Sequence, residues 1–430
     1  MSAPGPLLEI ERTVQHRAKS IAVDMATAGG REALRTLIGE AILAWQDEAA
    51  HGIRPTTIAD PETLAGRAWR NLAEYGPLTE PLADPDVWEI EINSPADIFV
   101  KRHRGRSGYH PETFHDDDHV LRTLTKLLDD SSGSHRKLDP TEGLQDAQLD
   151  DGSRLHIVHG DIARGGHCMV NIRRFTGVEF TRLDQLVTSG SLAMGAAHFL
   201  AAAVRSGASV VVAGAPGSGK TTLLSCILGE LDPALRVVTA EEVFELDVPL
   251  ANVASMQTRG ARSDRPAIDL RRLVSGFLRM APDVAVVGEV RDREALPLLL
   301  TLSSGVTGFT TVHASNARGA LSRLRFLAEL SDSARNLPHS ALTALVAESI
   351  DLIVFTERTT SGPRVREIIG VEDLSTRADS NSFTVTDIFR STSDRPLCWT
   401  GAVPSRLSGR AALRDIDLAA VLRSSAEVDR

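Results

Sequence analysis

The sequence predicts an α/β protein whose C-terminal half contains a mainly parallel sheet, preceded by an α+β domain and a helical N-terminal extension. Two observations carry most of this prediction. From residue 191 onward, short apolar runs alternate with segments of helical periodicity. The first of these apolar runs leads directly into a glycine-rich loop that is followed by a helix, an order typical of nucleotide-binding α/β domains.

Residues 1–58 are predicted to form a helical extension. Their periodicity places five apolar side chains on one helix face, with charges opposite. These side chains are Leu34, Leu37, Ile38, Ile42 and Leu43. We interpret the extension as an amphipathic layer on the next domain, and a helix that docks a partner is the alternative.

Residues 59–176 are predicted to form an α+β domain, because strand-like alternation appears on both sides of a helical segment. The predicted strands are 87–93, 98–100, 152–158 and 169–173, and the predicted helix is 120–128. Residues 177–190, which are rich in Gly, Ser and Thr, are predicted to be a linker.

Residues 191–375 are predicted to form the α/β domain, because continuous apolar runs suit strands buried on both faces of a parallel sheet. The predicted strands are 209–213, 237–240, 284–287 and 309–312, and the predicted helices are 222–228, 270–280 and 294–302. The tail, 376–430, is either an added hairpin layer or partly disordered.

Composition narrows the function classes. The net charge of −10 argues against a protein that mainly coats nucleic acid. The sequence has neither a signal-peptide pattern nor an apolar run long enough to span a bilayer, so we expect a cytosolic protein. Cys168, Cys226 and Cys398 lie far apart, which suggests buried small residues rather than disulfides or a zinc site.

The glycine-rich loop matches G-x-x-x-x-G-K-[ST] and predicts a nucleoside triphosphate site. Its residues and the one that follows are Gly214, Ala215, Pro216, Gly217, Ser218, Gly219, Lys220, Thr221 and Thr222. Lys220 is expected to reach the β- and γ-phosphates, and Thr221 is expected to ligate Mg²⁺. A chance glycine-rich turn that caps a helix is the alternative.

Acidic residues follow two of the predicted strands. Glu289 comes after 284–287 and one glycine, where a carboxylate could lie beside Mg²⁺ and the attacking water. Glu241 and Glu242 follow 237–240, at the sheet edge where ligands bind, so one of them could activate that water. An ordinary strand and turn, or a solvated acidic loop that includes Glu245, are the alternatives.

His313 ends the predicted strand 309–312. Its place one helix after the Glu289 strand suggests a sensor that hydrogen-bonds near the γ-phosphate. A structural histidine is the alternative.

With these motifs, the chain resembles the secretion-superfamily ATPases, and within them the Tad-pilus type called CpaF-like. The matching C-terminal motifs are the glycine-rich loop, Thr239–Glu242, Gly288–Arg291 with Glu294–Leu296, and Thr311–Arg318. The matching upstream segments are Gly76–Leu78, Glu91–Asn93, Asp151–Arg154 and Asn171–Phe175. The resemblance covers residues 70–355.

The resemblance implies a RecA-like C-terminal domain and a ring, usually a hexamer, in which ATP is held between the two domains of a subunit. It implies that Arg154 and Arg173 reach the γ-phosphate, and that Arg259 belongs to a motif of less defined role. Surface salt bridges are the alternative for each arginine. It also implies a Mg²⁺ site formed by Thr221, Glu242 and Glu289.

The sequence departs from the family pattern at two places. Glu242 replaces an acid that is usually aspartate, and Ala281 replaces a common arginine, which leaves Arg279 as the remaining match. The tetracysteine zinc insertion of type II secretion relatives is absent from the sequence, which disfavours that branch.

The predicted function is a Mg²⁺-dependent ATPase motor, a homo-hexamer at the cytoplasmic face of the inner membrane. It would act on a membrane platform protein to assemble a pilus or export protein, and nucleic acid is not expected as its partner. The alternatives are a DNA-translocating or conjugative ATPase, a regulatory subunit with weak turnover, and a metabolite kinase.

Overall fold

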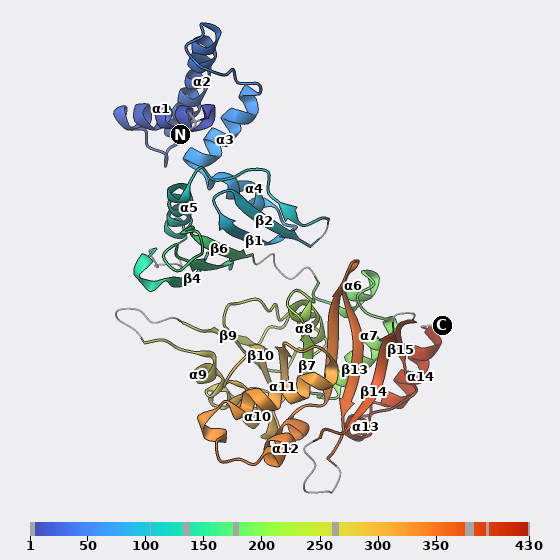
Figure 1. Ribbon diagram of the computed structural model, residues 1–430. Helices are drawn as coiled ribbons and strands as arrows, with labels where there is room; N and C mark the ends of the chain where they lie inside the picture. Colours follow the sequence, from blue (N-terminus) through green and yellow to red (C-terminus); the bar gives the residue numbers. More distant parts are fainter. Residues whose placement is uncertain are drawn as a thin grey trace. The chain divides into compact units, whose positions relative to one another are not determined.

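A computed structural model describes residues 5–103, 105–131, 138–174, 180–259, 266–374, 382–392 and 395–428. The chain divides into two compact units, Met1–Thr176 and Gly177–Arg430. The helices and strands of both are shown in Figure 1. Each unit buries apolar clusters of its own, and no cluster includes side chains from both units.

The N-terminal unit begins with three helices, α1 (Pro6–Ser20), α2 (Ala28–Ala50) and α3 (Pro61–Ala73). The Thr27 side chain accepts the N–H of Gly30 at the start of α2, and Asp60 accepts the N–H of Thr63 at the start of α3. The apolar faces of the three helices form one cluster. Its buried members include Ile10, Val14, Leu34, Leu37, Ile38, Ala41, Ile42, Trp45 and Ala68.

Leu43 is an exception to the predicted apolar face of the extension. Its side chain is 66% exposed, whereas the neighbouring Ile42 is buried. Consecutive helical residues point about 100° apart, so Leu43 is turned away from the cluster. The prediction that Leu43 shares the buried face is therefore wrong.

The rest of the N-terminal unit is an antiparallel sheet of six strands among the described residues, in the order β3-β2-β1-β6-β5-β4. The strands are β1 (Val87–Ser94), β2 (Asp97–Arg102), β3 (Gly108–Tyr109), β4 (Leu144–Gln148), β5 (Arg154–Val158) and β6 (Met169–Arg173). The helical segments are η1 (Gly76–Leu78), α4 (Thr79–Ala83), α5 (Asp117–Asp129) and η2 (Pro140–Glu142). Buried strand residues pack with Val120, Leu124 and Leu128 of α5, so this helix covers one face of the sheet.

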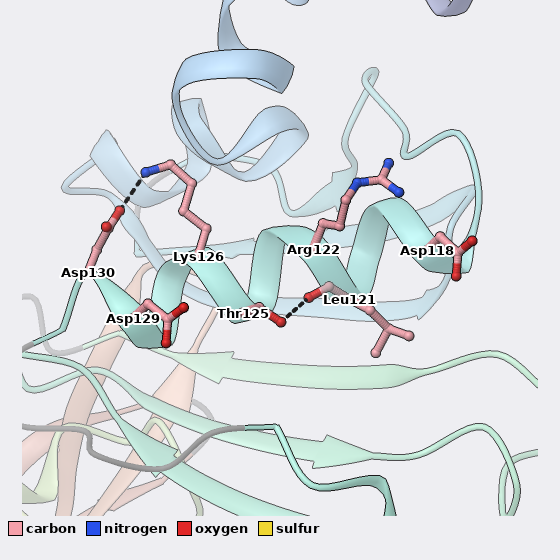
Figure 2. Close-up of a pocket in the computed structure, with 7 residues that line it drawn as sticks. All are labelled: Asp118, Leu121, Arg122, Thr125, Lys126, Asp129 and Asp130. Carbon is pink, nitrogen blue, oxygen red and sulfur yellow. Dashed lines mark hydrogen bonds and ion pairs between the residues drawn. The ribbon is translucent and has the colours of Figure 1, made fainter. Parts of the chain in front are cut away.

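The outer side of α5 carries a shallow depression (Figure 2). Lys126 Nζ lies 2.6 Å from Asp130 Oδ2 there, and the Thr125 hydroxyl donates to the Leu121 carbonyl at 2.8 Å. These groups satisfy one another along the helix, and no residue of the predicted nucleotide site lines the depression.

The C-terminal unit is built on a sheet of nine strands among the described residues, in the order β15-β14-β13-β12-β7-β11-β10-β8-β9. The strands are β7 (Val210–Gly214), β8 (Val237–Glu241), β9 (Val253–Gln257), β10 (Val284–Val290), β11 (Thr307–Val312), β12 (Leu352–Thr359), β13 (Gly362–Val371), β14 (Val385–Thr392) and β15 (Arg395–Trp399). Strands from β12 to β9 pair in parallel, and β13, β14 and β15 continue the sheet antiparallel. This confirms the predicted α/β class with a mainly parallel sheet.

Helices cover both faces of this sheet (Figure 1). The helices of one face are α6 (Leu183–Thr188), α7 (Met194–Arg205), α8 (Lys220–Leu228), α13 (Ser405–Ala412) and α14 (Leu418–Val428). Those of the other face are α9 (Leu270–Val274), η3 (Phe277–Met280), α10 (Ala295–Ser303), α11 (Ala317–Glu329), η4 (Asp332–Ala334) and α12 (His339–Ser349). Two apolar layers therefore sandwich a buried sheet.

Parts of the predicted linker and tail belong to this packed unit. In the linker range, α6 buries Leu183 and Leu186 against α7 and α8. In the tail range, β14 and β15 extend the sheet, and Leu418 and Leu422 of α14 pack in the same cluster. Linker residues 177–179 and residue 175 of the upstream motif lie outside the described residues.

Several element boundaries shift by one to three residues from the sequence prediction, and two of the differences bear on the site. The helix expected over 270–280 is divided into α9 and η3 around Gly276, a residue of low helix propensity. The strand expected to end at Val287 continues to Val290, with an irregular register against β11 after Val287. Glu289 consequently lies inside β10 rather than in a turn after it.

Cys168 and Cys226 are buried as predicted, but Cys398 is only half-buried. It lies in β15, an edge strand of the sheet, where one side of the ladder has no neighbouring strand.

Candidate functional site

The glycine-rich loop joins the end of β7 to the start of α8, which is the predicted strand, loop and helix order. Gly217 and Gly219 have φ values of +70° and +83°, a region that side chains other than glycine rarely adopt. The Ser218 hydroxyl is fully buried and has no hydrogen-bond partner within the described structure. The loop and the N-terminus of α8 thus form a cradle suited to phosphate.

Lys220 and His313 meet beside this loop. Lys220 is 7% exposed, and its Nζ donates to the Ala215 carbonyl at 2.9 Å and lies 3.2 Å from His313 Nδ1. His313 Nδ1 is also 3.2 Å from the Gly214 carbonyl oxygen. The structure therefore places the end of β11 against the loop lysine.

Glu289 continues this chain of contacts. Its Oε1 lies 2.6 Å from His313 Nε2, and its Oε2 accepts from Arg291 Nη2 at 2.7 Å. Burial alone would raise the pKa of Glu289, but the hydrogen bonds from His313 and Arg291 outweigh it and lower the pKa to about 2. Glu289 is therefore a charged carboxylate at neutral pH.

Arg291 links Glu289 to the acidic segment after β8. Its Nη1 donates to Glu242 Oε2 at 2.7 Å, while Nη2 holds Glu289. Burial lowers the pKa of Arg291, and its bonds to these carboxylates more than offset that effect, so the pKa lies above its usual value. In the sequence, Arg291 stands out only as the last residue of the Gly288–Arg291 motif, and its place two residues after Glu289 is the signal for this contact.

Glu241 is the last residue of β8 and is 3% exposed. Its Oε1 accepts the backbone N–H groups of Glu245 and Leu246, both at 2.9 Å. A Cβ built on Gly288 would lie 2.9 Å from Glu241 Cγ, so only glycine allows β10 to pass this close. The carboxylate is fixed by the loop that follows it and lies against β10.

Comparison with known protein families covers both the glycine-rich loop and the acidic strand ends. Residues 71–373 match the family described as type II/IV secretion system protein. The chain belongs to this family. The match includes the glycine-rich loop, both acidic strand ends and His313.

Several relatives of this secretion family resemble the chain. The conjugal transfer protein TrbB of Rhizobium radiobacter is 34% identical over 231 residues, which are 50% of this chain and 68% of the relative. The type IV secretion system protein PtlH of Bordetella pertussis is 30% identical over 315 residues, 67% of this chain and 91% of the relative. The ATPase DotB of Yersinia pseudotuberculosis has a TM-score of 0.49 and 18% identity, covering 82% of this chain and 85% of DotB.

The family's motif implies Mg²⁺, and the residues present fit it. The described residues contain no group of three His, Cys, Asp or Glu that could hold a metal alone. Mg²⁺ at phosphate sites needs only one or two carboxylates in addition to phosphate oxygens and water. Glu242 and Glu289, both bonded to Arg291 in this structure, are carboxylates of this kind, and Thr221 would add a hydroxyl oxygen. The ion would neutralise charge on the phosphates.

The two arginines expected at the γ-phosphate are neighbours in the N-terminal unit. Arg154 opens β5, Arg173 ends β6, and the two are directly opposite in the antiparallel ladder. Both are half-buried. Directly opposite residues of an antiparallel pair project from the same face of the sheet, so the two arginines lie on one face of the β5–β6 ladder.

The remaining family arginines have local contacts. The Arg259 backbone bridges to Ile268, and its Nη2 donates to the Pro266 carbonyl at 3.2 Å. Arg279 is exposed on η3, and Ala281, the departure from the family pattern, has φ +48°.

Within the described residues, no helix combines the length and apolarity needed to cross a membrane.

Proposed function

We propose that this chain is a Mg²⁺-dependent ATPase that works as a homo-hexameric motor at the cytoplasmic face of the inner membrane. One observation carries the ATPase part. The loop lysine Lys220 is joined through His313 to the carboxylate of Glu289, so phosphate binding and the acidic strand ends share one network. A bound phosphate that attracts Lys220 would change the contact of Lys220 with His313, and through His313 the contact with Glu289.

Hydrolysis by this site needs one water and one base. The water oxygen attacks the γ-phosphorus, the bond to the β–γ bridging oxygen breaks, and ADP and phosphate are the products. Glu241 is proposed to accept the water proton, because its carboxylate is fixed at the sheet edge beside β10. His313 is proposed to sense the γ-phosphate through its contact with Lys220.

Arg154 and Arg173 are proposed to stabilise the transition state, whose negative charge spreads over the equatorial phosphate oxygens. Their adjacent positions on β5 and β6 support this role, because a pair of guanidinium groups can bind several oxygens together. They would engage when the two units close on ATP and withdraw after hydrolysis.

Two substitutions test the ATPase. We expect Lys220→Ala to abolish ATP binding, and Glu241→Gln to bind ATP but retain it unhydrolysed. Phosphate released into water by the wild type, with no phosphorylated acceptor, distinguishes the ATPase from a kinase. Equal, negligible turnover in the wild type and Glu241→Gln would instead favour a regulatory subunit.

Sedimentation with a nonhydrolysable ATP analogue tests the proposed hexameric ring, and a strict monomer would contradict it.

The motor is proposed to act on a membrane platform protein that assembles a Tad-type pilus or exports protein, which follows from the resemblance to CpaF-like proteins. A prepilin and a polytopic membrane protein encoded beside this chain would support this proposal.

A DNA-translocating ATPase is the second candidate, because TrbB is described as a conjugal transfer protein. This candidate predicts that DNA stimulates hydrolysis, with a steep loss of stimulation as salt rises. An ATPase rate unaffected by DNA would remove it.

A further inference from the structure

A hairpin that lies outside the C-terminal sequence motifs makes hydrogen bonds to the glycine-rich phosphate loop. It consists of β12, the turn that follows, and β13. Strand β12 pairs in parallel with β7 along its length, and the last pair in that register is Thr356 with Gly214, the first residue of the loop. The last part of β12, from Thr356 to Thr359, therefore begins beside the loop.

We propose that Thr356 and Arg358 are positioning residues that orient the phosphate loop for nucleotide binding. This inference rests on the proposed ATPase function. Thr356 is 2% exposed, and its hydroxyl donates to the Ser218 carbonyl at 2.8 Å. Arg358 Nη1 donates to the Gly217 carbonyl at 3.2 Å.

These two bonds fix two successive peptide groups of the loop. In a trans peptide the C=O and N–H point to opposite sides of the chain. A carbonyl of Gly217 or Ser218 held toward β12 therefore turns the N–H of the next residue, Ser218 or Gly219, away from β12. Backbone N–H groups turned to one side of such a loop are what bind a phosphate.

The hydroxyl of Thr356 has a second acceptor nearby, the Arg364 carbonyl at 3.2 Å. A threonine hydroxyl carries one proton, and the shorter distance assigns that proton to Ser218. The bond is buried, so its loss would leave the Ser218 carbonyl without a replacement from water.

The other strand of the hairpin also contacts the loop. A Cβ built on Gly219 would lie 2.9 Å from Pro363 Cβ, so the glycine at this position is needed for packing as well as for its φ of +83°. Side chains of both hairpin strands thus approach the loop, and the loop conformation depends on a segment far from it in sequence.

Calorimetric titration of the full chain with MgATP tests the proposal. Thr356→Val keeps the shape and removes the hydroxyl, and the loss of one buried hydrogen bond is expected to weaken ATP binding about fivefold. Thr356→Ser retains the hydroxyl and is expected to bind within about twofold of the wild type. KM should rise by the same factor as Kd while kcat changes less, because the loop binds ground and transition states alike.

Arg358→Gln is compared with Arg364→Gln, an exposed arginine on the partner strand of the same hairpin. The two substitutions remove equal charge, so weaker ATP binding by Arg358→Gln alone isolates its contact with the loop. This pair tests the proposal even if thermal unfolding shows that Thr356→Val fails to fold.

The outcomes separate the two proposals. Wild-type affinity in a folded Thr356→Val, or equal affinity in the two arginine variants, overturns the positioning role and leaves the ATPase proposal intact. A wild-type chain that does not bind MgATP overturns the ATPase proposal itself.

Discussion

Arg291 is the side chain that holds two strand-end carboxylates together, since it contacts both Glu289 and Glu242 at 2.7 Å. We expect Arg291→Gln to lower the free energy of unfolding at pH 7 by about 1–3 kcal/mol, because Glu289 keeps its partly buried charge and loses a partner. Urea unfolding measures the loss. Arg293→Gln, which breaks an exposed 3.2 Å pair with Asp332, is the control and should cost at most about 1 kcal/mol.

The same pair has a defined pH dependence. The pKa of Glu289 is about 2 in the folded chain, below its ordinary value of 4.5, so the carboxylate stabilises the fold fully above pH 4.5. This stabilisation is lost as pH falls from 4.5 toward 2. The difference between the wild type and Arg291→Gln should therefore shrink over that window, and a difference independent of pH would contradict the assignment.

The residues of this site differ in how far sequence predicts them. Lys220 lies within a local motif. Glu289 lies next to the last residue of β10 and His313 follows β11, so the pairing of these parallel strands brings them to one sheet edge. Arg291 was missed because its contact with Glu242 depends on the side chain turning toward β8. A backbone pattern does not specify that direction.

Helix α13 is attached to the central sheet through Asp351, which is 1% exposed. Its carboxylate accepts from Arg406 at 3.0 Å, Arg410 at 2.5 Å and the Ser209 N–H at 2.8 Å. We expect Asp351→Ala to lower the free energy of unfolding by about 3–5 kcal/mol, because the buried Arg406 loses its close carboxylate partner and keeps only the carbonyls of Ala347 and Ile350 as acceptors. Thermal or urea unfolding measures this loss.

Asp373→Ala is the matched control for this element. Asp373 lies 4.0 Å from the same Arg406 but is 85% exposed, so its removal should cost less than about 1 kcal/mol. Equal losses in the two variants would mean that the buried pairing does not anchor α13.

The contact between β12 and the phosphate loop is a feature of the fold that sequence periodicity did not reveal. The contact of β12 with the loop joins Thr356 to Ser218, 138 positions away. Neither segment carries a local signal for it. In contrast, β8, β10 and β11 were predicted because continuous apolar runs mark strands buried on both faces.

At the scale of the whole molecule, the proposed chemistry is divided between two units, with the phosphate loop in one and Arg154 and Arg173 in the other. We expect the double change of both arginines to alanine to lower kcat about 10²–10³-fold. ATP binding should stay within a few-fold, because the loop and Lys220 remain. Phosphate release and calorimetry measure the two effects separately.

Arg122→Gln is the control for this double change. It removes one charge from the outer side of α5, in the same unit but away from β5 and β6, and should leave kcat and ATP affinity unchanged (Figure 2).

The C-terminal unit alone, Gly177–Arg430, has its own apolar clusters and the whole phosphate loop, so it should bind ATP and hydrolyse it as slowly as the double variant. If that unit alone hydrolysed ATP at the full rate, the arginines would have no part in the reaction. The N-terminal unit would then act after the chemical step, in transmitting the motion rather than in breaking the phosphate bond.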